Sequence, residues 1–233
     1  MPSPLRAALA ATLLLPCAAQ AQAQVQAGGW YAGLAAGQSR TADELVQNRE
    51  GTITLASDVH TAFDATGSAW KVFGGYRVNP YLALEATYAD LGRDTMATAF
   101  LGGDPAQPAA IRTTRKVAGF GADVLVGAPL GPRATLYARL GAFRSRLEAG
   151  AELSGNVVFN PGDPSERARS TTRTETVAHY GIGGEWSLTR DVALRLDWER
   201  YAKVGKAFQV GGTGTTGEAD MDAWLVGVAL RFR

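Results

Sequence analysis

Residues 75–93 read GYRVNPYLALEATYADLGR, which is the pattern of two strands joined by a tight turn. The turn falls at 78–81, where asparagine and proline interrupt the alternation. Beyond it, Leu82 and Leu84 share one face and Glu85 lies on the other, because strand side chains alternate with a period of two. The stretch therefore predicts a hairpin with one apolar face and one face of small and charged residues.

The same alternation recurs along the chain. Each of these segments is long enough for a tilted membrane strand, which needs about 9–11 residues, whereas ordinary strands average about 5–6. They lie at residues 28–38, 69–78, 81–91, 116–127, 134–146, 175–188, 191–201 and 223–233.

This pattern predicts an all-β fold, an eight-stranded antiparallel up-and-down transmembrane β-barrel with apolar residues toward lipid. The alternative is a soluble barrel with its apolar face inside. The second face decides between them, because it carries small residues such as Gly33, Gly121 and Gly183, as a narrow interior requires. In lipid the sheet must also close, so the first segment is expected to pair with the eighth.

Composition narrows the function classes. Charged residues are 19% against about 25% in soluble domains, and the net charge of +1 gives no field that would attract nucleic acid. The hydrophobic content of 46% argues against disorder. No apolar run reaches about 18 residues, so no transmembrane helix is expected.

Residues 1–23 have the pattern of a secretory signal peptide, and the barrel is expected to occupy 24–233. Arg6 supplies the positive charge, an apolar run follows, and small residues allow cleavage after Ala21 or Ala23. The sole cysteine, Cys17, lies in this segment. Lipidation of that cysteine is the alternative, but a proline precedes it where a lipoprotein signal has a small residue.

The connections alternate in length, with short periplasmic turns and long outside loops as in outer-membrane barrels, so both termini are expected on the periplasmic side. The short turns lie at 78–81, 128–133 and 189–190. The long connections lie at about 39–68, 92–115, 147–174 and 202–222.

Outward-facing aromatic residues are expected at the two membrane interfaces, where a ring can lie among headgroups. The upper girdle is predicted to comprise Trp70, Tyr88, Phe120, Tyr180, Trp198 and Trp224. The lower girdle is predicted to comprise Trp30, Tyr76, Trp186 and Phe232.

Four stretches resemble the transmembrane domain of the outer membrane protein A family: 75–93, YARLGA at 137–142, GGEWSLTRDVALRLDWERY at 183–201 and WLVGVALRF at 224–232. The resemblance implies a monomeric barrel in the outer membrane of a Gram-negative bacterium, in contact with lipid and lipopolysaccharide. It implies assembly by periplasmic chaperones and the barrel-assembly machinery, which reads a last strand ending on an aromatic residue. Family members typically continue into a peptidoglycan-binding domain, which is expected to be absent here.

Glu85, Arg139, Glu185, Arg195 and Asp197 fall on the inward face and match the family's lumenal salt-bridge network. Buried charges are costly unless paired, so Glu85 is expected to pair with Arg195 or Arg139. The family has an inward lysine near the place of Leu125, which this chain lacks. Lys71 is the available substitute, although it lies higher on the second segment.

The expected function is a structural or surface-interaction role in the cell envelope. The alternative is a narrow porin-like channel gated by lumenal salt bridges, although eight strands enclose little more than side chains. No enzymatic activity, cofactor or metal is expected, because His60 and His179 are distant in sequence and no Ser-His arrangement stands out.

Arginines of the third long connection offer a further contact. Arg167, Arg169 and Arg173 can pair with lipopolysaccharide phosphates, and ordinary solvated loop charge is the alternative.

Overall fold

The computed structural model describes residues 28–42, 57–102, 107–155, 157–160, 162–205 and 218–232. The expected signal peptide and Cys17 lie outside these ranges. Over these residues, no helix is both long and apolar enough to cross a bilayer. The strands are β1 Gly29–Thr41, β2 Ser57–Asp64, β3 Thr66–Asn79, β4 Leu82–Gly102, β5 Gln107–Pro129, β6 Ala134–Gly155, β7 Ala168–Ser187, β8 Val192–Val204 and β9 Ala219–Arg231.

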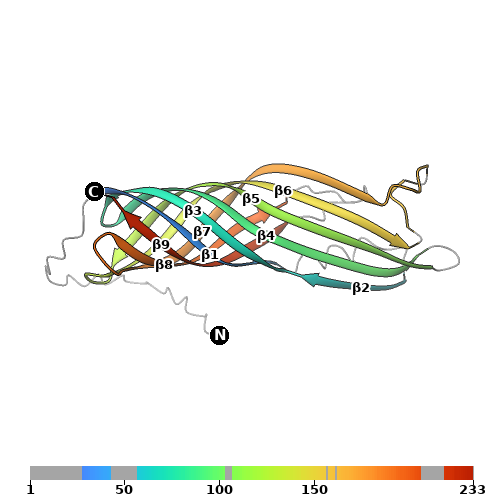
Figure 1. Ribbon diagram of the computed structural model, residues 1–233, viewed down its shortest axis with the longest axis horizontal. Coiled ribbons are helices and arrows are strands. Elements are labelled where there is room, and N and C mark those ends of the chain that lie inside the picture. Colours follow the sequence, from blue (N-terminus) through green and yellow to red (C-terminus); the bar gives the residue numbers. More distant parts are fainter. Residues whose placement is uncertain are drawn as a thin grey trace, which may run out of the picture.

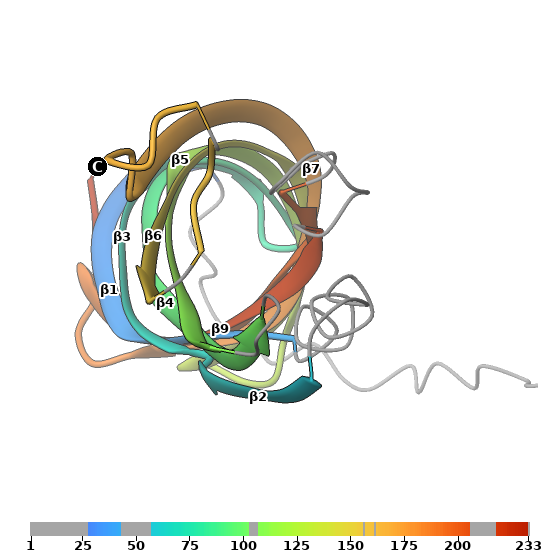
Figure 2. The ribbon, with the colours of Figure 1, turned by 90° about the vertical axis from the view of Figure 1, so that its right-hand side faces the viewer.

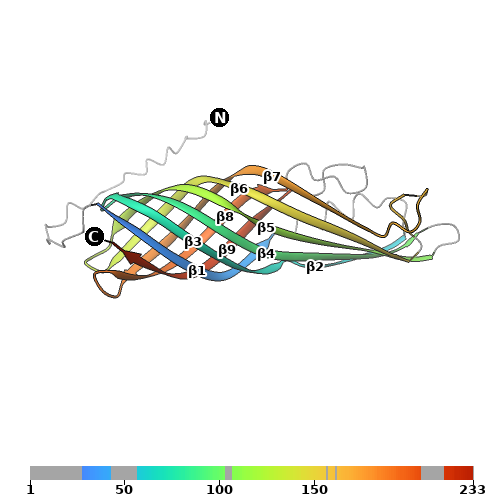
Figure 3. The ribbon, with the colours of Figure 1, turned by 45° about the horizontal axis from the view of Figure 1, so that its top comes forward.

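Eight of these strands form a closed antiparallel ring in the order β1-β3-β4-β5-β6-β7-β8-β9, and β9 pairs back onto β1. At this closing pair, Leu34 lies opposite Val228 and Gly37 opposite Leu225. Seen end-on, the strands enclose a ring, and from the side they tilt against its axis (Figures 2 and 3). The predicted all-β eight-stranded up-and-down barrel is confirmed.

Burial alternates along each ring strand with the period of two. In β6, Leu140 is 67% exposed on the outer face, whereas the neighbouring Arg139 and Phe143 on the inner face are 2% and 0% exposed. A soluble barrel would bury its leucines and expose its arginines. The outward apolar side chains therefore identify this part of the ring as the surface that faces lipid.

The short connections, the start of β1 and the end of β9 all lie at one end of the molecule (Figure 1). The short turns lie between β3 and β4, β5 and β6, and β7 and β8. In the first of them the backbone amide of Tyr81 donates to Asn79 Oδ1 at 2.8 Å, so the asparagine side chain stabilises the turn. Tyr31, near the start of β1, lies opposite Arg231 at the end of β9. By the rule that outer-membrane barrels have short periplasmic turns, this end is periplasmic.

Several strands run much further than expected. The expectation of long loops at 92–115 and 147–174 was wrong over most of these ranges, because β4 and β5 pair from Leu82↔Val126 to Gly102↔Gln107, and β6 pairs with β7 up to Glu152↔Ala168. The four long strands project beyond the rest of the ring (Figure 1).

The projecting part follows the opposite burial rule. Met96 and Phe100 of β4 and Leu147 of β6 point inward and are at most 8% exposed, whereas Arg112 and Arg146 are exposed on the outer face. Outside the membrane the apolar face turns inward, as in a soluble sheet. The pattern of outward apolar residues, from which the strands were predicted, therefore ends at the membrane surface, although the strands continue beyond it.

The strand β2 was not expected, because residues 39–68 were predicted to be a loop. It pairs with the projecting part of β4, with Ala62 opposite Ala97, and lies outside the ring (Figure 2). Its Phe63 packs against the buried Met96 and Ala219. His60, expected in a loop, lies on this strand and is exposed.

Candidate functional site

The middle of the barrel interior holds a buried group of charged side chains contributed by six strands, here called the central cluster. Their side chains are at most 1% exposed. Its members are Lys71, Glu85, Asp123, Arg139, His179, Arg195, Asp197 and Glu199.

Glu85 is held by two guanidinium groups and one phenol. Arg195 Nη1 lies 2.7 Å and Arg139 Nη2 3.0 Å from its carboxylate oxygens, and the Tyr31 hydroxyl donates to it at 3.0 Å. Sequence reasoning named Arg195 and Arg139 as alternative partners, and the structure brings both to Glu85. Charge-assisted contacts of this kind offset the cost of burying the carboxylate.

A second chain of contacts leads from Arg195 to Asp197. Arg195 Nε donates to the Tyr137 hydroxyl at 2.9 Å, and that hydroxyl donates to Asp197 Oδ1 at 2.5 Å. The Arg195 guanidinium also lies 4.1 Å from the ring centroid of Phe73. The guanidinium is therefore fixed by an anion, a phenol and an aromatic face.

Arg139 contacts more carboxylates than any other cation of the central cluster. Its Nη atoms lie 3.0 Å from Glu85 and Glu199 and 3.4 Å from Asp123 and Asp197. One guanidinium thus contacts four carboxylates on three other strands.

Lys71 takes part in the same cluster from the opposite wall. Its Nζ lies 3.2 Å from Asp197 and forms an ion pair with Glu199. Lys71, which sequence reasoning named as the available lysine, thus reaches the lumenal carboxylates. Leu125 is buried among apolar side chains.

His179 lies between two carboxylates. Its Nδ1 is 2.8 Å from Asp123 Oδ1 and its Nε2 is 3.3 Å from Glu199 Oε2. The ring stacks on Tyr201, with centroids 4.3 Å apart and an interplanar angle of 12°. The Tyr201 hydroxyl donates to Glu199 as well, at 2.7 Å. Sequence reasoning expected neither a catalytic nor a metal-binding role for His179 and did not place it in this group.

The formal charges of the central cluster sum to zero only if His179 is protonated. Glu85, Asp123, Asp197 and Glu199 carry four negative charges, whereas Lys71, Arg139 and Arg195 carry three positive ones. A neutral imidazole has one N–H and would turn a lone pair toward one carboxylate, whereas an imidazolium has an N–H on each nitrogen. Both the charge sum and the two contacts therefore favour the protonated ring.

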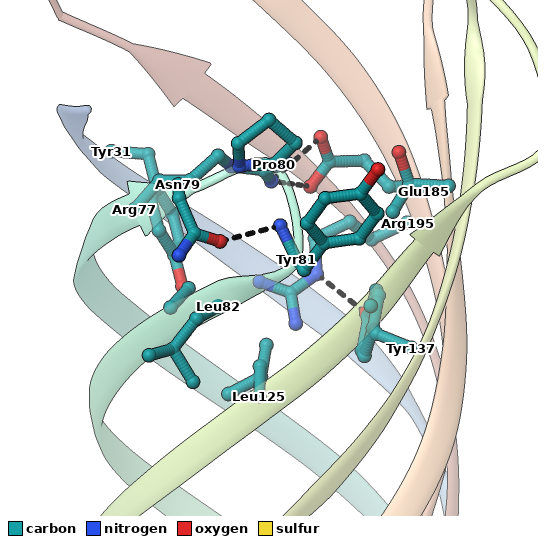
Figure 4. A pocket seen from close by; sticks show the side chains of 13 residues that line it. Tyr31, Arg77, Asn79, Pro80, Tyr81, Leu82, Leu125, Tyr137, Glu185 and Arg195 are labelled. Carbon is teal, nitrogen blue, oxygen red and sulfur yellow. Dashed lines mark hydrogen bonds and ion pairs between the residues drawn. The ribbon is translucent and has the colours of Figure 1, made fainter. Parts of the chain in front are cut away.

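Glu185 lies apart from the central cluster, at the periplasmic mouth. It pairs with Arg77 at 3.3 Å and with Arg231, whose guanidinium also donates to Ser187 at 2.9 Å. Figure 4 shows the Arg77–Glu185 ion pair among the residues that line a pocket, together with Tyr137 and Arg195. The expectation that Glu185 belongs with the other lumenal charges in one network was therefore wrong. Glu185 forms separate ion pairs at the periplasmic mouth.

The outward aromatic residues lie at two levels of the barrel wall. Rings are in contact at the lower level between Trp30 and Tyr76, whose centroids are 5.1 Å apart. At the upper level, the contacts join Trp70 to Tyr88, Tyr88 to Phe120, and Trp198 to Trp224. Trp186 and Phe232 lie near the short turns and are exposed, and Tyr180 is 37% exposed on the outer face of β7.

Sequence reasoning missed part of the central cluster. Asp123 and Glu199 lie on the inward face by parity, and the tyrosines that bridge the ions, Tyr31, Tyr137 and Tyr201, have the same parity. Parity was the signal that could have found them. Resemblance named only positions that match the family. In the ranges described, no group of three or more histidine, cysteine or carboxylate side chains could hold a metal ion.

A closed ring of tilted strands, apolar outside and filled with paired charges inside, defines a transmembrane β-barrel. The chain belongs to the outer membrane protein beta-barrel domain family, whose model matches residues 8–232. It is therefore a protein of the Gram-negative outer membrane.

Individual relatives agree with this family. Outer membrane protein A of Klebsiella aerogenes is 29% identical over 223 residues, covering 95% of this chain and 53% of the relative. Outer membrane protein A of Salmonella typhi is 29% identical over 222 residues, covering 95% and 53%. The chain thus spans about half the length of these curated relatives.

Solved structures with a similar fold include Neisserial surface protein A, with a TM-score of 0.49 and 15% identity, covering 89% of this chain and all of that one. The attachment invasion locus protein of Yersinia pestis has a TM-score of 0.48 and 14% identity, covering 88% of this chain and 99% of that one.

Proposed function

We propose that this protein is a structural barrel of the outer membrane. Its lumen is closed to solutes, and its outer surface contacts the surrounding lipid and lipopolysaccharide. The observation that carries the proposal is the central cluster, whose ion pairs join β3, β4, β5, β6, β7 and β8 across the lumen with no exposed member. A filled lumen gives rigidity and leaves no continuous water path.

The partners belong to the same proposal. A monomer in contact with outer-membrane lipid and lipopolysaccharide is supported by the apolar outer wall and its two aromatic levels. Chaperones and the barrel-assembly machinery act before the barrel is complete, which fits a last strand that alternates outward through Trp224, Val226 and Val228. A catalytic role is not proposed, because His179 is buried between two carboxylates and faced by no hydroxyl nucleophile among its described contacts.

Planar-bilayer recording of the refolded chain tests the closed lumen. We expect a bilayer with no long-lived conductance steps, and vesicles that swell in small sugars no faster than vesicles without protein. A large, stable pore would contradict the structural role.

A narrow channel gated by lumenal salt bridges is the second candidate. It is favoured by one observation, the four carboxylates within 3.4 Å of Arg139, because a guanidinium with several partners can exchange them at small cost. If this gate exists, Arg139→Ala raises small-ion conductance above that of the parent chain. If the lumen is a structural plug, the same variant loses stability without gaining conductance.

A further inference from the structure

Four basic side chains gather on the outer wall just above the upper aromatic level, on β4, β5 and β6. We call this set the outer basic patch: Arg93, Lys116, Arg144 and Arg146. Arg93 lies opposite Lys116, and Arg144 lies opposite Phe120. Phe120 is 68% exposed toward lipid, so its register partner Arg144 projects from the same outer face.

The patch lies at the height of lipid headgroups. Arg144 is level with Phe120, and Lys116 lies four residues before Phe120 on β5, toward the end of the strand that projects beyond the ring. At about 3.3 Å per residue and a tilt of about 40°, the patch extends from the girdle to roughly 10 Å above it. Girdle rings lie at the headgroup level, so these cations meet the phosphates of the outer leaflet.

The outer basic patch has more basic side chains than acidic partners to neutralise them. Lys116 pairs with Asp90 at 3.4 Å and Arg146 with Glu148 at 3.1 Å. The ion pairs of the described residues include neither Arg93 nor Arg144. The patch with its two acidic neighbours therefore carries a surplus of positive charge.

The other side of the same rim is neutralised. Arg200 forms a two-pronged pair with Asp222, with both distances 2.7 Å, and Lys203 lies 3.5 Å from Glu218. Of these two stretches of the described rim, the wall formed by β4, β5 and β6 is therefore the one with surplus positive charge.

Of the three arginines singled out from the sequence, Arg167 and Arg169 contact groups close to them in the chain, whereas Arg173 lies on β7 opposite Leu147. Arg167 donates to the carbonyls of Gly155 and Val157 at 2.7 and 2.8 Å. Arg169 pairs with Glu166 at 2.6 Å, and this hydrogen bond holds the pKa of the Glu166 carboxyl below its ordinary value.

We propose that the outer basic patch binds the phosphate groups of lipopolysaccharide in the outer leaflet. Guanidinium groups pair with phosphate through two parallel hydrogen bonds, and the flanking aromatic rings pack against the acyl chains below. The inference rests on the proposed placement of the barrel in the outer membrane, with the long strands outward.

Native mass spectrometry of the refolded full chain in a maltoside detergent tests this surface, with bisphosphorylated lipid A as the probe. The test variant is Lys116→Gln/Arg144→Gln/Arg146→Gln, and the control is Arg133→Gln/Arg190→Gln, which removes exposed cations at the opposite end. We expect the test variant to weaken binding about tenfold or more, which corresponds to roughly 1.4 kcal/mol, and the control to bind as the parent does.

Three outcomes overturn the proposal: equal binding by the test variant, equal weakening in the control, or equal binding of phosphatidylglycerol and lipid A. The single variant Arg144→Gln provides a second measurement if the triple variant does not fold, which the heat-dependent shift of folded barrels on gels reports. A conducting barrel that still binds lipid A through the patch would refute only the closed lumen, so the two proposals fail separately.

Discussion

At the scale of single residues, His179 is the side chain on which the charge balance of the lumen depends. Four buried carboxylates face three permanent cations, and both ring nitrogens face carboxylate oxygens. We expect nitrogen NMR of the folded barrel at pH 7 to show both ring nitrogens protonated. A neutral tautomer at that pH would contradict the charge balance.

The variant His179→Gln tests the same balance by stability. Glutamine cannot carry the fourth positive charge, so we expect a loss of about 1–3 kcal/mol in the free energy of unfolding. Adding Asp123→Asn removes one carboxylate and should recover part of that loss. Urea unfolding in vesicles, followed by tryptophan fluorescence, measures both. Strictly additive losses would show that the two groups are not coupled.

Glu85 accepts three hydrogen bonds within the barrel interior, from Arg195, Arg139 and Tyr31. Glu85→Gln leaves two guanidinium groups buried with one fewer anion. We expect a loss of about 3–5 kcal/mol in the free energy of unfolding.

The matched control for Glu85 is Glu218→Gln. Glu218 pairs with the exposed Lys203 at 3.5 Å, and surface pairs contribute about 0–1 kcal/mol. Losses of similar size in the two variants would mean that the central cluster does not stabilise the barrel.

At the scale of strands, glycine on the inner wall makes room for the ions. A Cβ atom at Gly183 of β7 would lie 2.6 Å from Asp197 Oδ1 and 2.6 Å from the Tyr137 ring. At Gly184, the next residue along the strand, the nearest atom is the carbonyl oxygen of Thr135 at 4.0 Å.

This contrast predicts unequal effects of one added methyl group. Gly183→Ala must displace the hydroxyl and carboxylate that hold Arg195, and we expect a loss of about 1–3 kcal/mol. Gly184→Ala should leave stability almost unchanged. Unfolding in urea compares the two, and equal effects would refute the steric argument.

A single long strand can carry its apolar side chains on the outer face in one part and on the inner face in another. In β6, Leu136 and Leu140 face lipid, whereas Leu147 and Leu153 further along face inward. The strand continues because its backbone stays paired, and the apolar face changes sides because the solvent outside changes from lipid to water.

At the scale of the whole molecule, we expect the two aromatic levels to set the height of the barrel in the bilayer. All five tryptophans belong to the two girdles: Trp30 and Trp186 below, and Trp70, Trp198 and Trp224 above. Tryptophan fluorescence should therefore be quenched more by lipids brominated near the headgroup than by lipids brominated near the chain end. Stronger quenching from the bilayer centre would contradict this placement.

Parity along the sequence was enough for the faces of the strands and for the fold class. Alternation through 75–93 already separates Leu84 from Glu85, because a strand has only two sides and the bilayer makes their chemistry unequal. It also put Arg139 and Arg195 on the inner wall. Pairing of the first segment with the last follows from the need to close the sheet in lipid.

Only the tertiary structure decided which of those inward residues meet. Lys71 of β3 reaches Glu199 of β8, and Glu185 lies with Arg77 and Arg231 at the mouth instead of in the central cluster. Parity gives the side of a strand but not the height of a residue along the barrel. Height is set by the stagger of all eight strand pairs, which only the closed ring fixes.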